Sequence, residues 1–378
     1  MSRPSKFPEI ASLIEQRIQR GDYLLSGLQS DRTIAEEFNI SRLTARHAIR
    51  LLVDRGFIIR KTNGRLELPG RESADASVRQ VAFLAPSFPS PFIQRLRLAA
   101  EQIVTARGSR FRPIDYLHWS DPVVHETMQR FDGAIMVPPA GGDLLPEQVE
   151  RMRNARAGML LVGWDLSGQG VPSLMINPPE GTQTLCDHLA TLGHKRIDCL
   201  SVHAPSNGIN LRMQQWRLWR AAHGVDGTLH DHRLQSYANP MQGGYDVTKA
   251  LLAAGTLGQA LVCTSELTTI GACRAMAEVG LLPGRDISIA TWGGDGLCRF
   301  YSPSISCLEM PDLAPYLRVW FDWIDGGRKG WVGPLLLRPD DSLFAGESTA
   351  PPGGWPAGER HLAGPVPSAA LPPIVNAR

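Results

Sequence analysis

Apolar residues recur three and four positions apart in three stretches near the amino terminus, at residues 10–18, 34–38 and 45–52. This spacing places them on one face of a helix. Asn39 is suited to a left-handed turn, and Ser41 is suited to cap the helix that follows it. The pattern therefore predicts three short helices, with a tight turn before the third.

Two further apolar runs, at residues 57–59 and 66–68, flank the pair Asn63-Gly64. An Asn-Gly pair in that setting is the strongest local signal for a β-hairpin. Helix, helix, turn, helix and hairpin is the order of a winged helix-turn-helix domain, which we place at residues 1–70. The small and polar residues at 71–78 predict a linker after it.

The body of the chain, residues 79–349, alternates unbroken apolar runs with helical patterns. The runs lie at residues 81–84, 133–137, 159–162, 197–200, 260–263 and 287–290. Unbroken apolar strands indicate sheets covered on both faces, so this region is predicted to be α/β with parallel strands. Its length of about 270 residues suits two such sheets. Ligands of these folds bind outside the carboxyl ends of the strands.

Composition excludes several classes of protein. No run of about 18 apolar residues is present, which excludes a membrane-spanning helix, and the amino terminus has no apolar signal-peptide core. The six cysteines are scattered without a Cys-x-x-Cys pair, so we expect free thiols in a reducing compartment, the cytoplasm. Residues 350–378 contain 7 Pro, 4 Gly and 6 Ala, which predicts a disordered tail.

Charge is distributed unevenly along the chain. Residues 1–71 contain 13 Lys or Arg and 8 Asp or Glu, a net charge of +5, whereas the remainder has 26 basic and 29 acidic residues, a net charge of −3. A basic head is typical of a protein that binds a polyanion, although chance asymmetry is an alternative. Arg42, Arg46 and Arg50 fall on the outward face of the third predicted helix. This favours DNA, because the major groove admits one helix.

The segment from Leu28 to Ile49 resembles the GntR-type winged helix, whose pattern is roughly L-P-S-E-R-x-L-A followed by V-S-R-x-T-V-R-x-A-L. Gln29 and Asn39 depart from this pattern. The wing departs too, since Arg65-Leu66-Glu67 stands where G-T-F or G-T-V is usual. The resemblance covers about residues 7–68. The DNA contacts that it implies are Arg32, Ser41, Arg42, Thr44 and Arg46 and, at the wing tip, Lys61, Gly64 and Arg65.

Motifs for catalysis are missing from the body. The sequence has no G-x-S-x-G elbow, no Walker loop and no G-x-G-x-x-G after a strand. Asp165, Glu266 and Asp295 each follow a strand end, where a catalytic site and a binding site would both use a carboxylate. His230-Asp231-His232 lacks the further ligands of a metal site. We therefore expect no enzyme activity, no metal and no cofactor.

Six segments of the body resemble the LacI-type sensor domain, which shares the fold of periplasmic sugar-binding proteins. Leu192-Gly193-His194-Lys195-Arg196-Ile197 is similar to G-H-[RK]-[RK]-I, and Thr264 to Gly271 is similar to N-D-x-x-A-x-G. The other segments are residues 212–225, 283–289, 302–307 and 337–349. The resemblance implies a small molecule in a cleft that separates two Rossmann-like lobes joined by three strands. Lobe one is expected at about 79–175 and 307–332, and lobe two at about 176–306 and 333–349.

The same resemblance assigns an effector site. Arg212 takes the place of the arginine that grips the ligand through its hydrogen-bonding fork. The family's two aspartates fall on Gly163 and Gly293, and an aspartate stands two residues after each of them. Tryptophan near a sugar suggests stacking, although core packing is the favoured alternative for Trp292. The implied effector residues are Ser87, Phe88, Phe92, Trp164, Asp165, Arg212, Ser265, Glu266, Trp292 and Asp295.

Together the two resemblances imply a one-component transcription regulator with the arrangement of arabinose-repressor-like proteins. The expected partners are operator DNA, a small-molecule effector such as a sugar, and a second copy of the chain in a homodimer, without a membrane. Repression that the effector relieves is the expected mode. The alternative is a carrier or a hydrolase that uses the same cleft without binding DNA. The basic third helix disfavours the carrier, and the absent nucleophile motif disfavours the hydrolase.

Overall fold

The computed structural model describes residues 7–19, 23, 28, 30–62, 64–67, 78–87, 90–139, 144–176, 178–235, 238–293, 296–329, 331, 335–340 and 342–354. The chain forms two compact units: Met1–Met175 with Asp312–Arg338, and Ile176–Pro311 with Pro339–Arg378. The predicted linker at 71–77, Phe88, Asp295 and the tail from residue 355 lie outside the described residues. Within the described part, no helix is long and apolar enough to cross a membrane.

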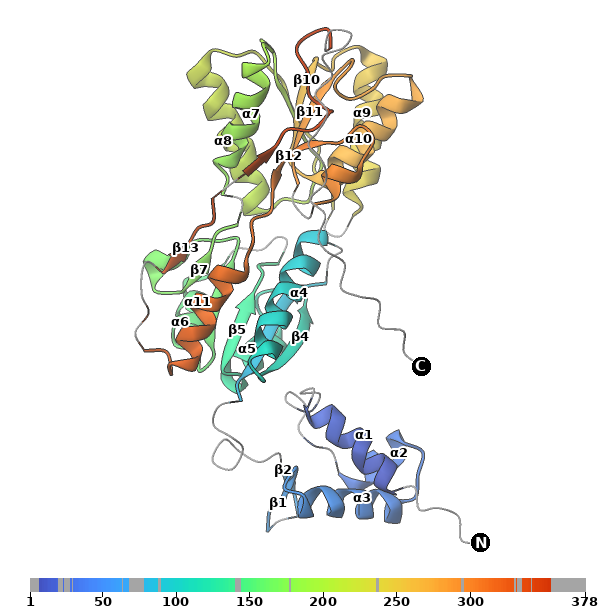
Figure 1. Ribbon diagram of the computed structural model, residues 1–378, viewed down its shortest axis with the longest axis vertical. Coiled ribbons are helices and arrows are strands. Elements are labelled where there is room, and N and C mark those ends of the chain that lie inside the picture. The colour runs from blue at the N-terminus through green and yellow to red at the C-terminus, as the bar shows by residue number, and fades with distance from the viewer. Residues whose placement is uncertain are drawn as a thin grey trace. The chain divides into compact units, whose positions relative to one another are not determined.

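The head, residues 7–67, has the element order predicted for a winged helix-turn-helix (Figure 1). Its elements are α1 (Phe7–Gln19), α2 (Asp31–Glu37), α3 (Arg42–Asp54), β1 (Ile59–Arg60) and β2 (Leu66–Glu67). The two strands pair in antiparallel fashion. The buried face of α3 consists of Ala45, Ala48, Ile49 and Leu52. Two of these side chains are only alanines, so α3 packs closely against α1 and α2 in the head core.

Local signals fix both the turn and the hairpin of the head. The Ser41 hydroxyl accepts a hydrogen bond from the Thr44 amide at 3.1 Å and so caps α3, as predicted. Asn39 has φ 49°, the left-handed conformation expected before that helix. In the hairpin, the Lys61 amide donates to the Arg65 carbonyl at 2.9 Å. Gly64 has φ 79°, which residues with a side chain rarely adopt.

The first unit contains a six-stranded parallel sheet with the strand order β13-β7-β6-β5-β3-β4. The strands are β3 (Gln80–Pro86), β4 (Arg110–Tyr116), β5 (Gly133–Met136), β6 (Gly158–Val162), β7 (Ser173–Leu174) and β13 (Leu336–Leu337). The helices are α4 (Pro91–Ala106), α5 (Pro122–Arg130), α6 (Pro146–Arg153), η1 (Ser167–Gln169) and α11 (Ala314–Asp325). α11 lies very close to the sheet, because a Cβ added at Gly133 would come within 2.9 Å of the Trp320 ring.

The second unit contains another six-stranded sheet, with the order β14-β12-β11-β10-β8-β9, in which only β14 is antiparallel. The strands are β8 (Asp198–Ser201), β9 (Leu229–Asp231), β10 (Ala260–Cys263), β11 (Ser288–Trp292), β12 (Ser306–Glu309) and β14 (Ser342–Phe344). The helices are α7 (Gly181–Thr191), α8 (Asn207–His223), α9 (Pro240–Ala254), α10 (Glu266–Glu278) and η2 (Leu297–Phe300). Two separate hydrophobic clusters, with α7 and α8 in one and α9 and α10 in the other, join these helices to the sheet. The α/β fold with parallel sheets is therefore confirmed.

Two boundaries differ from the predicted ones. The chain returns to the first unit at Asp312 and leaves it after Arg338, rather than at residues 307 and 332. The reason is strand pairing: β12 pairs in the second unit's sheet, and β13 pairs with β7 in the first. The prediction of disorder from residue 350 is wrong for Ala350 itself, which is fully buried. The Ala350 carbonyl lies 2.9 Å from both His194 Nε2 and Ser288 Oγ.

Candidate functional site

The outward face of α3 carries three exposed arginines, Arg42, Arg46 and Arg50. Nε of Arg46 lies 3.2 Å from Oδ2 of Asp31, at the start of α2, and 60% of the Arg46 side chain is exposed. Arg42 and Arg50 have no ion-pair partner in the part of the chain that the structure describes. Leu43, which no sequence pattern singled out, is 61% exposed on the same helix. An apolar side chain there fits contact with a thymine methyl group.

The other predicted DNA residues also lie on the surface of the head. Arg32 is 70% exposed, with its Nε 2.9 Å from Oε1 of Glu36 one turn further along α2. Lys61, Gly64 and Arg65 are exposed at the hairpin tip. Thr44 is half-buried in the first turn of α3, beside the capping Ser41. The eight predicted residues thus share one small domain, and Ser41 has a structural role in addition to the one proposed.

In the first unit, the predicted effector residues follow the carboxyl ends of two strands. Ser87 comes directly after β3 and lines a hollow of about 630 Å³, and Phe92 lies in the first turn of α4. Trp164 follows β6 and packs against Trp119, with ring centroids 5.5 Å apart. Asp165 is exposed, and its Oδ1 accepts hydrogen bonds from both the amide and the hydroxyl of the residue two positions later, at 2.9 and 2.6 Å.

In the second unit, Arg212 on α8 is held by two contacts. Its Nη1 donates to the Thr264 carbonyl at 2.7 Å, and its guanidinium carbon lies 4.1 Å from the centroid of the Trp292 ring. Trp292 ends β11, is 3% exposed and donates from Nε1 to Oγ1 of Thr182 at 3.1 Å. The stacking partner of Trp292 in the structure is therefore Arg212, so this tryptophan orients the arginine.

His203 belongs to the same cluster, and sequence patterns did not identify it. It follows β8 by two residues, and its Nε2 lies 2.6 Å from Oγ of Ser265 and 3.3 Å from Oγ1 of Thr268. Ser265 also caps α10. Burial, together with the charge of Arg212, lowers the pKa of His203 to about 4, so the imidazole is neutral at pH 7. The only available signal was its position after the carboxyl end of a strand.

Arg212 carries a charge that has no ion-pair partner in the part of the chain that the structure describes. Burial lowers the pKa of Arg212 to about 10, which still leaves the guanidinium charged at pH 7. Among the described residues, no acidic side chain lies within ion-pair distance of it. The side chain keeps partial exposure, so a solute can reach it. We call Arg212, His203, Thr264, Ser265 and Trp292 the arginine cluster.

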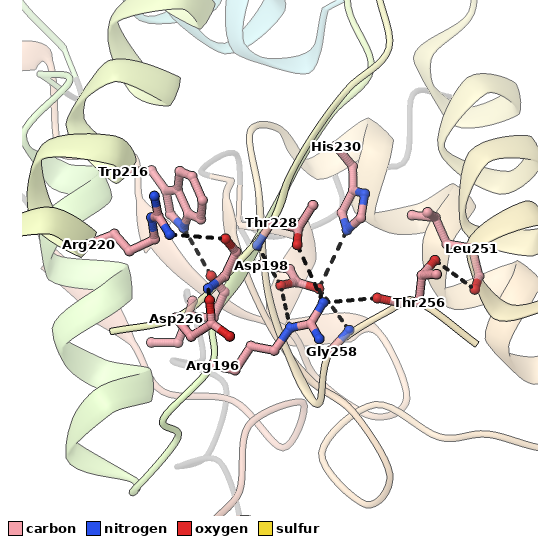
Figure 2. A network of polar contacts seen from close by, with 12 residues as sticks. Arg196, Asp198, Trp216, Arg220, Asp226, Thr228, His230, Leu251, Thr256 and Gly258 are labelled. Atoms are coloured by element: carbon pink, nitrogen blue, oxygen red, sulfur yellow. Dashed lines mark hydrogen bonds and ion pairs between the residues drawn. The ribbon is translucent and has the colours of Figure 1, made fainter. Parts of the chain in front are cut away.

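Glu266, which directly follows Ser265, and His230 are further candidates in the second unit. Glu266 lines an apolar hollow of about 650 Å³ together with Ile270, Leu282 and Tyr301. Nε2 of His230, considered as a metal ligand, is 3.5 Å from buried Asp198 (Figure 2). The described residues contain no group of three His, Cys, Asp or Glu side chains arranged for a metal. The six cysteines are all free thiols.

Known proteins resemble the chain both in sequence and in fold. Residues 186–312 match the family model of the periplasmic binding protein-like domain. The chain is 22% identical over 200 residues to the probable HTH-type transcriptional repressor ExuR of Bacillus subtilis (strain 168). That match covers 53% of this chain and 58% of the relative, so it spans little more than half of the relative's length.

Solved structures extend the likeness over most of the chain. The lac repressor dimer bound to operator and the anti-inducer ONPF has a TM-score of 0.61 and 19% identity, over 74% of this chain and 97% of that one. A LacI family transcriptional regulator from Enterococcus faecium with bound ribose has a TM-score of 0.59 and 17% identity, over 72% of this chain and 99% of that one. At these identities the likeness establishes the fold.

Proposed function

We propose that the chain is a DNA-binding transcriptional repressor whose affinity for its operator is controlled by a small molecule. The observation that carries the proposal is the combination, in one chain, of an exposed arginine-bearing α3 with two parallel α/β units. The match to HTH-type repressors and to operator-bound and ribose-bound regulators supports it. The head supplies DNA recognition, and the two units supply effector binding.

The head belongs, in this proposal, to the GntR type of winged helix. α3 enters the major groove, and Arg42 and Arg46 lie four residues apart on its exposed face. The hairpin tip, with Lys61 and Arg65, contacts the phosphate backbone. A carrier or a hydrolase that does not bind DNA would make neither contact. A test of operator binding therefore separates this proposal from those alternatives.

The effector binds, in this proposal, at the carboxyl ends of the strands, where the arginine cluster of the second unit lies. In the first unit, the residues proposed for effector binding are Ser87, Phe92, Trp164 and Asp165. The ribose-bound relative supports a carbohydrate or a related metabolite as the class of effector. A guanidinium fixed by a carbonyl and an aromatic ring is well suited to grip such a ligand.

The repressor acts as a homodimer in the cytoplasm. A single head buries little surface on DNA, and regulators of this kind pair to read two half-sites. The lac repressor dimer supports the same assembly here. Sedimentation of the full chain at micromolar concentration tests this point: a dimer is expected, and a monomer would contradict it.

The experiment that tests the function is a gel shift of the full chain on the DNA upstream of its own gene. We expect a retarded protein–DNA complex that unlabelled DNA of the same sequence competes away. At least one member of a panel of sugars and sugar acids should reduce the amount of this complex. Arg42→Ala with Arg46→Ala is the matched control for the head, and Arg217→Ala, exposed on α8, is the control for lost charge alone. Absence of specific binding would contradict the proposal and favour the carrier.

A further inference from the structure

The arginine cluster presents one positive charge in a fixed orientation. The Thr264 carbonyl accepts a hydrogen bond from one N–H of Arg212, and the guanidinium lies over the ring of Trp292. A guanidinium has five N–H donors arranged in a fork that matches a planar carboxylate. The remaining donors of Arg212 have no acceptor among the described residues. Within the described part of the chain, these donors are therefore available to an acceptor that a ligand brings.

The position after Trp292 carries no carboxylate, in contrast to the LacI-type pattern. The LacI-type pattern has an aspartate where Gly293 stands. A Cβ added at Gly293 would come within 2.9 Å of Sγ of Cys298 and 3.1 Å of Cβ of Cys307. A side chain at this position would therefore require Cys298 and Cys307 to shift in a closely packed region. Gly293 therefore contributes close packing against two cysteines instead of a carboxylate.

The other titratable side chain of the arginine cluster adds no charge. His203 is neutral at pH 7, and its Nε2 is engaged with the hydroxyls of Ser265 and Thr268. The cluster thus carries a net charge of +1 among the described residues. A ligand with one negative charge balances it, whereas a phosphate monoester, with a charge near −2 at pH 7, exceeds it. A neutral sugar that covers the half-buried guanidinium leaves it without a counter-charge, which is costly once the site is closed to water.

From this balance we infer that the effector carries a carboxylate, which the guanidinium of Arg212 binds as a bidentate pair. The inference rests on the proposed function, in which the arginine cluster contacts the effector. It narrows the class of effector from sugars in general to small organic acids, with uronates and aldonates as the members closest to a sugar.

Matched pairs of probes test this inference without DNA. Calorimetric titration of the full chain compares D-glucuronate with D-glucose, D-galacturonate with D-galactose and D-gluconate with D-glucitol, and includes glucose 6-phosphate. We expect at least one carboxylate to bind about 10- to 100-fold more tightly than its neutral partner, the range of one charged hydrogen-bonded contact. Titration extends to about 10 mM, above the ~1 mM Kd of a weak binder.

Two sets of variants assign the effect to the cluster. Arg212→Gln should weaken carboxylate binding about 10- to 100-fold, whereas Arg217→Gln, an exposed arginine on the same helix, should leave it unchanged. Ser265→Asp keeps a capping side chain on α10 and adds a carboxylate next to Thr264, so it should abolish the preference for acids. Ser265→Asn, the uncharged match, should keep the ratio of the affinities for an acid and its neutral partner, whatever it does to the two affinities themselves. The Ser265 pair carries the test if Arg212→Gln does not fold.

Four results would overturn the inference: a neutral partner that binds as tightly as its acid, glucose 6-phosphate as the tightest ligand, full binding by Arg212→Gln, or no binding of any carboxylate. The gel shift keeps this failure distinct from failure of the proposed function. If the chain binds its operator and releases it only when a neutral sugar is added, the proposed carboxylate effector is wrong but the proposed repressor function stands. A chain that binds no operator refutes the repressor, whatever the titration shows.

Discussion

Arg196 and Asp198 form a two-point ion pair at the amino end of β8, with Nε to Oδ1 at 3.0 Å and Nη2 to Oδ2 at 3.2 Å (Figure 2). Asp198 is fully buried and also accepts hydrogen bonds from the backbone amides of Thr228 and Gly258, at 2.8 Å each. The carboxylate therefore joins β8 to the segments that precede β9 and β10. This network therefore connects the amino ends of these strands, whereas the arginine cluster lies at the carboxyl ends.

Replacing the buried carboxylate should destabilise the second unit. Asp198→Asn keeps the shape but places an amide nitrogen against two N–H donors, and we expect a loss of about 2–4 kcal/mol in the free energy of unfolding. Asp226→Asn, at an exposed position in the same network, should cost less than about 0.5 kcal/mol. Urea denaturation followed by circular dichroism measures both. Equal losses for the two variants would contradict the assigned role of Asp198.

The same carboxylate makes stability depend on pH in acid. Burial alone would raise the pKa of Asp198, but hydrogen bonds from His230, Arg196 and two amides lower it to about 2. A pKa that is lower in the folded state means that the unfolded chain binds the proton more tightly. The stabilisation is thus complete above about pH 4, the ordinary pKa of an aspartate, and is lost as pH falls toward 2. Asp198→Asn should show a smaller loss of stability over this window.

The capping residue of α3 allows helix stability to be separated from DNA contact. Ser41→Ala should weaken α3 by about 1 kcal/mol, because the Thr44 amide loses its acceptor. Ser41→Asp should preserve the cap but repel phosphate. Hydrogen exchange of the α3 amides reports on the helix, and operator titration reports on binding. If Ser41→Asp binds DNA as well as the wild type, Ser41 only caps the helix.

Base recognition should depend on the exposed arginines of α3. Arg46→Ala should cost about 1–3 kcal/mol of operator affinity if its fork reads a base edge. Because Arg46 forms an ion pair with Asp31 in the structure, Asp31→Asn should release the arginine side chain and should not weaken operator affinity. Titration at fixed salt measures both variants, since phosphate contacts depend steeply on salt. Unchanged affinity for Arg46→Ala and for Arg42→Ala would exclude α3 as the recognition helix.

Sequence patterns predicted the centres of the sheets better than their edges. The six apolar runs correspond to β3, β5, β6, β8, β10 and β11, all buried strands. β4 was not predicted, because Arg110, Arg112 and Pro113 interrupt its apolar pattern at the edge of a sheet, where one side needs no partner. Short β14 is recognised only through its pairing with β12.

Long-range contacts explain what the sequence did not reveal in the site and the tail. His203 joins the arginine cluster through Ser265, a residue 62 positions away, and no local pattern marks such a contact. Ala350 sits in a segment whose composition indicates disorder, yet its carbonyl is bound by His194, 156 positions earlier. Arg212 was predicted because it lies in a family pattern on α8, whereas its orientation by Trp292 needed the fold.

The effector response should be separable from operator binding at Arg212. Arg212→Gln leaves α3 and the hairpin unchanged, so the variant should bind operator with wild-type affinity. It should no longer release the operator when the wild-type effector is added, because a ligand shifts an equilibrium only by its differential affinity for the two states. Linkage makes the test two-sided: if the effector weakens DNA binding of the wild type by some factor, DNA must weaken effector binding by the same factor.

Four measurements are needed to test this linkage, namely operator affinity with and without effector and effector affinity with and without operator. In Arg212→Gln both factors should fall to about one. A variant that loses operator binding outright would place Arg212 in the structural core rather than in the site. A variant that keeps the full response would show that the effector is held by other residues.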